Sequence, residues 1–228
     1  MSRVNDGKQL TIQAGESTFE RLPLKTKLIT QEDDIAEVAR EFALPFLQQG
    51  DILFISEKAV ACSQGRAIPM AEIKPRPLAK FLTRFVYKSP YGIGLGIPET
   101  MEMALRECGV LRILFAAGIS AVGKLLGKRG WFYKVAGYRA ESIDGPTPNT
   151  IPPYNNYVVL GPLKPDETAQ RIADTIGFAC AIVDINDLTG KTLGASAGVD
   201  KELVAASLKD NPLGQSRQQT PMGILRRQ

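Results

Sequence analysis

The chain has 228 residues, of which 44% are apolar and 23% charged, and a net charge of +4, which is typical of a globular protein with one large domain or two small ones. It contains no histidine, which excludes histidine general bases, Ser-His and Cys-His nucleophile pairs and histidine-ligated zinc. Any chemistry must use carboxylates, lysine, arginine, hydroxyls, backbone amides or a metal, and oxygen ligands favour magnesium or manganese.

Short apolar runs separated by glycine, proline and polar turns predict both strands and helices in the first part of the chain. The expected strands are Leu10–Gln13, Leu24–Ile29, Asp51–Ile55 and Val110–Ala116. The expected helices begin at Thr30, with Asp33 at the capping-box position, and span Pro77–Val86, Pro98–Glu107 and Gly118–Leu126.

The clearest break in the pattern is Pro146–Asn156, which is rich in proline and asparagine. After it, we expect strands at Tyr157–Leu160 and Ala179–Val183 and helices at Asp166–Gly177 and Asp200–Leu208. The loose alternation predicts an α/β or α+β fold with mixed sheets and flanking helices. We place a boundary between an N-terminal α/β region, 1–145, and a C-terminal region, 146–228, with one intertwined domain as the alternative.

Cysteine usage and apolar patterning bear on the compartment. The three cysteines are isolated and form no C-x-x-C pair, which favours a reducing compartment, and the N-terminus has no apolar signal core. Val110–Leu126 carries Arg112 and Lys124 and is too short and interrupted to span a membrane. The sequence therefore predicts a cytoplasmic protein with no membrane partner and, given its mild charge, no nucleic-acid partner.

The stretch Ala179–Gly194 carries the densest group of polar candidates. Its predicted strand is followed, across a glycine-punctuated turn, by Asp184, Asn186, Asp187, Lys191 and Thr192. Ligands collect beyond strand ends in sheet proteins, and two carboxylates with a lysine suit a divalent cation that holds a phosphate. The alternative is an Asx-rich turn whose side chains cap their own backbone.

Two glycine patterns do not predict a nucleotide loop. Gly190 and the two residues after it resemble the end of a P-loop, but Ile185 stands where that motif requires a glycine. The glycines at 92, 94 and 96 follow no strand and lack the dinucleotide-binding spacing.

The segment Ser56–Ala67 is a second candidate, because it follows the predicted strand Asp51–Ile55. It groups Lys58, Ser63, Gln64, Gly65 and Arg66. Ammonium, hydroxyl and guanidinium donors of this kind bind phosphate. The alternative is a helical turn with a solvated lysine and a glycine at its C-terminal end.

A run of basic residues without an acidic neighbour comprises Lys124, Lys128, Arg129, Lys134 and Arg139. It is either a solvated face or an anion-receiving surface, with Trp131, Phe132 and Tyr133 available to stack on a flat ring.

Five segments of the sequence are similar to the motifs of a known protein family. In chain order they are QEDDIAEVA, GDILFISEKAVACSQGRAI, KVAGYRAESID, LKPDETAQRIADTI and VDINDLTGK. Together they resemble the coenzyme F(420)-0:γ-glutamyl ligase family, which uses GTP and a divalent cation to attach glutamate to a deazaflavin coenzyme precursor. By position, the resemblance implies a metal-binding role for Asp187 and a phosphate-side role for Lys58, Gly65 and Lys191. It also implies the family's fold and a homodimer.

The sequence departs from the family's motifs at metal-binding positions. Leu188 stands where the family has a second ligand, and Arg139 stands where an aspartate is expected, so that Asp144 is the nearest substitute. We therefore expect Asp144, Asp184 and Asp187 as ligands of Mg²⁺ or Mn²⁺, with Asp187 and Lys191 as the catalytic pair. Lys58, Ser63, Gly65, Arg66 and Lys191 are expected at the nucleotide phosphates.

The resemblance implies an amide ligase that joins a small acid to an amino acid through an acyl phosphate, with GTP as co-substrate. Charge neutralisation and positioning supply the catalysis, and neither needs histidine. Two alternatives stay open: a non-catalytic relative that binds a nucleotide or another anion, and a ligase with a different acceptor. No guanine-reading motif separates GTP from ATP.

Overall fold

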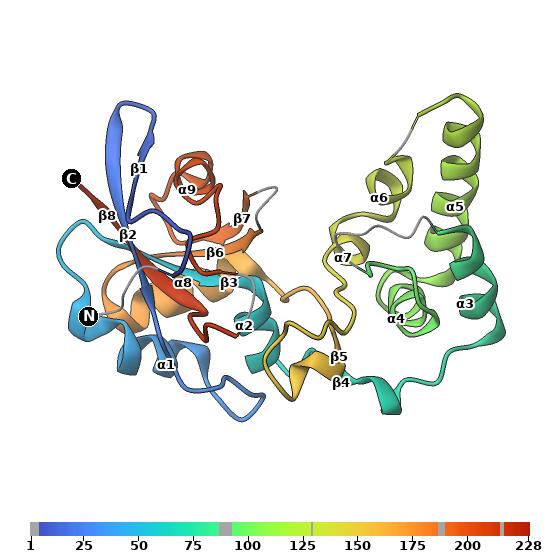
Figure 1. Cartoon of the computed structure of the whole chain (residues 1–228), viewed down its shortest axis with the longest axis horizontal. Coiled ribbons are helices and arrows are strands. Elements are labelled where there is room, and N and C mark those ends of the chain that lie inside the picture. The colour runs from blue at the N-terminus through green and yellow to red at the C-terminus, as the bar shows by residue number, and fades with distance from the viewer. Residues whose placement is uncertain (1–4, 87–92, 129, 187–189, 215–216) are drawn as a thin grey trace. The chain divides into compact units, whose positions relative to one another are not determined.

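The computed structural model describes residues 5–86, 93–128, 130–186, 190–214 and 217–228. Its mixture of sheet and helices (Figure 1) confirms the predicted fold class. The chain divides into two compact units: unit 1 consists of Met1–Arg66 and Pro162–Gln228, and unit 2 of Ala67–Gly161.

These bounds differ from the boundary expected after residue 145. Unit 2 begins with strand β4 (Ala67–Pro69) and closes with β5 (Tyr157–Val159), and the two strands pair antiparallel. The pairing brings the two ends of unit 2 together, so that this unit is inserted into the sequence of unit 1. The proline-rich segment near 146–156 lies inside unit 2, before β5.

Unit 1 is built on a sheet whose described strands follow the order β1-β2-β8-β3-β6-β7 (Figure 1). Their bounds are β1 Thr11–Ala14, β2 Ser17–Leu24, β3 Ile52–Ser56, β6 Ala179–Ile185, β7 Gly190–Ala195 and β8 Met222–Arg227. β3 and β6 are parallel, and the other neighbouring pairs are antiparallel.

Alternating side chains of the central strands pack against helices on opposite faces of this sheet. Leu53 of β3 and Ile182 of β6 belong to the core shared with α1 (Ile35–Phe42), α2 (Glu57–Ser63) and α8 (Pro165–Ile176). Phe54 and Val183 belong to the core shared with α9 (Lys201–Ser207). Figure 1 shows α1 and α9 on opposite sides of the sheet.

The predicted strand Leu24–Ile29 is wrong, because β2 ends at Leu24. The extent of β2 was hidden by polar residues within it, among them Arg21, whose side chain is fully buried. Its guanidinium group donates to the Asp210 carboxylate and, at 2.6 Å, to the Gln9 carbonyl oxygen. A buried charge is tolerated in a strand only when it is paired in this way.

Unit 2 is mainly helical. Its helices are α3 (Pro77–Leu82), α4 (Pro98–Cys108), α5 (Val110–Leu125), α6 (Trp131–Ala136) and α7 (Tyr138–Glu141). Short 3-10 turns span Met70–Glu72, Thr83–Phe85 (η3) and Tyr154–Asn156 here, and Leu44–Phe46 in unit 1. The helix expected at Pro98–Glu107 is confirmed as α4.

The strand expected at Val110–Ala116 is wrong, because this segment begins the sixteen-residue helix α5. The buried residues of α5 are Ile113, Ala116 and Gly123, and this spacing is helical. A short apolar run does not by itself distinguish a buried strand from a helix.

Within the described ranges, no single helix has both the length and the apolar character needed to cross a membrane. α4 and α5 meet that criterion only as a pair, and the pair is bent by 116°.

Candidate functional site

The two candidate segments found in the sequence meet at one end of the sheet of unit 1. Ser56, the last residue of β3, is the register partner of Val183 in β6. Because the strands are parallel, Lys58 in α2 and Asp184 in β6 both follow directly at the carboxyl ends of adjacent strands. Such strand ends are where ligands bind in open α/β sheets. We call this end of unit 1 the β3–β6 end.

Lys191 belongs to the same end. It is the direct partner of Asp184 across the antiparallel pair of β6 and β7. Directly opposite residues share a face, and alternation along β6 assigns Asp184 to the face of Ile182, which packs against α2. Asp184 is half-buried and Lys191 exposed. Asp187 and Leu188 lie outside the described residues.

The start of β7 shows that the residues from Gly190 onward do not form the end of a P-loop. Gly190 begins a strand that runs to Ala195, whereas a P-loop leads into a helix. The exclusion of a P-loop, made from Ile185, is thereby confirmed.

α2 has the glycine-terminated end that was the alternative interpretation of Ser56–Ala67. The amide N of Arg66 donates to the Ala61 carbonyl oxygen at 2.9 Å, and the amide N of Gly65 donates to that of Cys62 at 3.0 Å. This is a Schellman motif, and Gly65 supplies its left-handed residue with φ of 68°. Gly65 therefore has a structural reason to be glycine.

Two further polar residues of α2 make local bonds. The Ser63 hydroxyl donates to the Val60 carbonyl oxygen at 2.8 Å. The Gln64 side chain donates to the Leu163 carbonyl oxygen at 3.1 Å and accepts from the Leu163 amide at 2.7 Å, which ties α2 to the start of α8. Of the predicted phosphate group, Lys58 is exposed and Arg66 is half-buried, and both carry cations of the kind that binds phosphate.

The structure adds a loop that the sequence analysis missed. β2 and β3 are both antiparallel to β8, so β2 also ends at the β3–β6 end, and Lys25 and Lys27 follow it as exposed residues. The Lys27 ammonium lies 2.6 Å from an Asp33 carboxylate oxygen, which raises the pKa of Lys27 and lowers that of Asp33. The loop was overlooked because its apolar residues resembled a strand.

Asp144 belongs to unit 2 and not to the unit that carries Asp184. Its backbone forms a bridge with Val159, with N–O distances of 2.9 and 3.0 Å. Arg139, which stands at the family's aspartate position, lines a pocket of about 350 Å³ in unit 2. Arg112 lines the same pocket, and its Nε donates to the Val135 carbonyl oxygen at 3.0 Å. Glu107 and Cys108 also line it, so the charged groups of this pocket are two guanidinium groups and one carboxylate.

The predicted metal ligands do not form a metal centre among the described residues. In those ranges, no group of three or more Cys, Asp or Glu side chains is placed to hold a metal ion. Of the three expected ligands, Asp184 lies at the β3–β6 end of unit 1, Asp144 belongs to unit 2, and Asp187 is outside the described residues.

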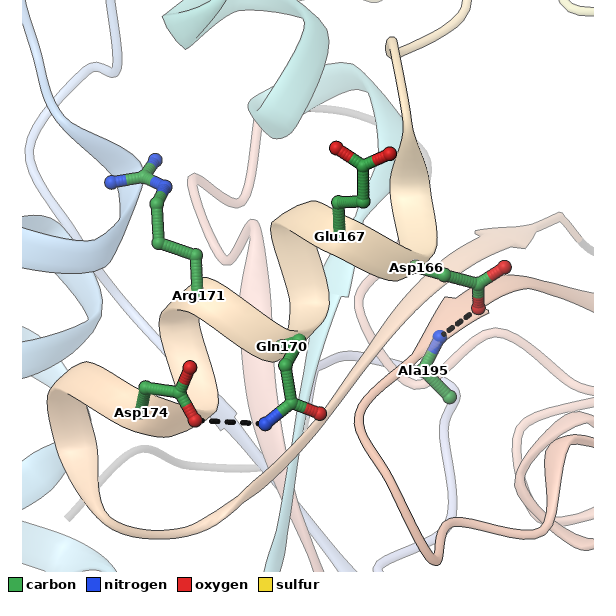
Figure 2. A pocket seen from close by; sticks show the side chains of 6 residues that line it. All are labelled: Asp166, Glu167, Gln170, Arg171, Asp174 and Ala195. Atoms are coloured by element: carbon green, nitrogen blue, oxygen red, sulfur yellow. Dashed lines mark hydrogen bonds between the residues drawn. The ribbon is translucent and has the colours of Figure 1, made fainter.

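A second pocket, in unit 1, lies along α8 and has a volume of about 490 Å³. Figure 2 shows two hydrogen bonds among its lining residues: the Asp166 carboxylate accepts from the Ala195 amide at 2.9 Å, and Gln170 donates to Asp174 at 2.8 Å. Arg171 binds both carboxylate oxygens of Asp34 at 2.8 Å. These bonds fasten α8 to β7 and to the start of α1, so we assign the polar residues of this pocket a structural role.

Comparison with known proteins agrees with the resemblance found in the sequence. Residues 23–197 match the family model described as F420-0:Gamma-glutamyl ligase. The chain is also similar to the coenzyme F420:L-glutamate ligase of Methanopyrus kandleri, with 29% identity over 177 residues. That match covers 76% of this chain and 60% of the Methanopyrus kandleri protein.

Proposed function

The chain belongs to the F420-0:gamma-glutamyl ligase family, and we propose that it is a nucleotide-dependent ligase that joins a small carboxylic acid to an amino acid. The observation that carries the proposal is the register of β3 and β6, which brings Lys58 and the Asp184–Lys191 pair to one end of the sheet. Phosphoryl transfer depends mainly on positioning and on charge neutralisation, and cations at a strand end suit both.

In the proposed reaction, a carboxylate oxygen of the acid attacks the γ-phosphorus of the nucleotide, and the bond to the leaving nucleoside diphosphate breaks. The amine of the amino acid then attacks the acyl carbon, loses a proton and displaces phosphate. Lys58, Arg66 and Lys191 would neutralise phosphate oxygens. Ser63 and Gly65 would contribute less, since both have local structural roles.

We keep Mg²⁺ or Mn²⁺ as a proposed requirement, with Asp184, Asp187 and Asp144 as the expected ligands. A bound divalent ion would supply charge neutralisation at the phosphates. Because the described residues form no metal centre, we assign no step to it.

The named relative acts on coenzyme F420 and L-glutamate. We extend to this chain the proposals of a deazaflavin acceptor, glutamate as amino acid, GTP as nucleotide and a homodimer. The chain spans about 60% of that relative's length, so each of these needs its own test.

A non-catalytic relative that binds a nucleotide or another anion is the second candidate. Two replacements favour it: Arg139 at the expected aspartate position, which lines a pocket together with Arg112 and Glu107, and Leu188 at an expected ligand position. A ligase with a different acceptor remains the third.

A thermal-shift titration with GTP, GDP and ATP, each with Mg²⁺, Mn²⁺ or EDTA, tests the proposal. A ligand at about 100 times its dissociation constant should add roughly 2.7 kcal/mol to the free energy of unfolding. Asp187→Asn should abolish the metal-dependent part of the shift, whereas Asp6→Asn, at an exposed carboxylate before β1, should not.

Phosphate release in the presence of a small acid and glutamate would then separate the ligase from the non-catalytic relative. Absence of a shift with every nucleotide would reject the ligase and would leave only a relative that binds a different anion.

A further inference from the structure

Exposed apolar side chains are concentrated on one part of unit 2. Among the described residues, most of the large apolar side chains exposed to solvent belong to α3, η3 and α5 or directly follow α5. These are Phe81, Phe85, Leu111, Leu114, Phe115, Val122, Leu125 and Leu126. Leu111 and Leu125 are 83% and 87% exposed, values rare for leucine in a folded protein.

The exposed residues of α5 lie on one face of the helix. Leu111, Leu114, Phe115, Val122 and Leu125 recur at intervals of three, four or seven residues. The opposite face holds the buried Ile113, Ala116 and Gly123. We call the exposed face, together with Leu126, the α5 stripe. α5 packs on the core of unit 2 through its buried face, so the α5 stripe takes no part in the packing of this unit.

Phe81 and Phe85 extend the α5 stripe. Their rings pack edge to face, with centroids 5.2 Å apart, and both are more than half exposed. The Lys124 ammonium in the last turn of α5 donates to the Phe85 carbonyl oxygen at 3.0 Å, which holds η3 beside that turn. The result is a broad apolar surface that contains three aromatic rings, those of Phe81, Phe85 and Phe115.

The sequence segments that carry this surface have charged residues of a single sign. The segments 73–98 and 108–140 contain eleven lysine and arginine residues and no acidic residue. The exposed ones on or next to the helices of the stripe are Lys80, Arg84, Arg112, Lys124 and Lys128. Unit 2 has twelve basic and six acidic residues, a net charge of +6, so unit 1 carries −2 of the total of +4.

We propose that the α5 stripe docks on an anionic membrane surface, with the helix lying in the headgroup region rather than crossing the bilayer. Leucine and phenylalanine on one face, with lysine and arginine around them, suit an interfacial helix that inserts its apolar side and attracts anionic lipids. The sequence predicted no membrane partner because Val110–Leu126 is unsuited to spanning; an interfacial helix needs no span. If two copies of the chain met through this surface, their two copies of unit 2, each with a net charge of +6, would repel each other.

Vesicle cosedimentation of the full chain tests this proposal. Binding is expected to vesicles with about 30 mol% phosphatidylserine, to be much weaker to phosphatidylcholine alone, and to fall in about 0.5 M salt. Leu111→Glu with Leu125→Glu should reduce the apparent affinity at least tenfold. The matched control is Leu10→Glu with Phe46→Glu, which adds the same charge at exposed apolar positions of unit 1 and should bind as the wild type does.

Three outcomes would overturn the proposal: no binding to either vesicle, equal binding to both, or equal loss in the two double variants. Light scattering covers the competing occupant. If Leu111→Glu with Leu125→Glu converts a dimer into a monomer and the wild type binds no vesicles, the stripe is an interface between copies. These measurements do not involve nucleotide, so their failure is separable from failure of the proposed ligase.

Discussion

Asp184 and Lys191 are direct partners across β6 and β7, at the end of the sheet where α2 begins. Opposite charges in this position stabilise a strand pair by about 0.2–1 kcal/mol. Lys191 is also exposed, and it is the first basic residue after Asp187 in the sequence. The pair therefore has a structural contribution that any functional test must separate from binding.

Lys191→Gln should weaken nucleotide binding roughly tenfold, equivalent to about 1.4 kcal/mol, because it removes one of the cations proposed to bind the phosphates. Isothermal titration calorimetry measures this directly. Arg227→Gln is the control, since Arg227 is an exposed cation at the opposite end of the same sheet. Equal dissociation constants for the two variants would remove Lys191 from the site.

Arg226→Lys should destabilise unit 1 by about 1–3 kcal/mol. Arg226 binds the buried Asp51 through Nε at 2.9 Å and Nη2 at 2.7 Å, and Nη2 also donates to the Phe46 carbonyl oxygen at 3.0 Å. Lysine cannot reproduce this two-pronged geometry. Arg227→Lys, one residue further along β8 and exposed, should change stability by less than about 0.5 kcal/mol. Chemical denaturation followed by circular dichroism compares the two.

Glu102→Gln should destabilise unit 2 by about 2–3 kcal/mol. The Glu102 side chain is 1% exposed and accepts from Arg76 Nε at 3.0 Å, from the Arg76 amide at 3.1 Å and from Arg106 Nε at 2.9 Å. Trp131, the single tryptophan of the chain, lies in unit 2, so its fluorescence during urea unfolding reports the change. Glu72→Gln, at an exposed position of the same unit, is the control.

The same carboxylate makes the stability of unit 2 sensitive to acid. Burial raises the pKa of Glu102, but the Arg76 amide and the Arg106 and Arg76 guanidinium groups lower it by more, so the net shift is downward. The resulting stabilisation is present above the unfolded pKa of about 4.3 and is lost as pH falls through the folded value. Between neutral pH and that range, wild type should therefore lose more stability than Glu102→Gln; parallel losses would contradict this assignment.

Gly194→Ala should destabilise unit 1 by about 3 kcal/mol, because a Cβ there would overlap the backbone of Pro165 at the start of α8. The backbone contact leaves no flexible side chain to move aside. Gly118→Ala in α5, where a Cβ would meet nothing within 4 Å, should instead stabilise the helix by up to about 1 kcal/mol. Thermal unfolding of both variants checks the opposite signs.

Local patterns were sufficient for some elements and not for others. The strand at Asp51–Ile55 and the helix at Pro98–Glu107 were predicted, because a buried apolar run and a proline-led helical period are visible within a short window. β8 was missed because MGILRR is short and basic; it becomes a strand by pairing with β2 and β3 on either side. The first half of α5 was predicted as a strand because apolar residues occupy both its buried face and its exposed face.

The sequence by itself determined the mixed fold class, the family, and the chemistry available without histidine, because composition and short motifs carry that information. It also named Lys58, Asp184 and Lys191 as candidates. Only the tertiary structure decided that β3 and β6 are parallel neighbours, that their ends meet, and that Asp144 belongs to another unit. Strand pairing between residues more than a hundred positions apart depends on the packing of both sheet faces, and no local window of the sequence contains that energy.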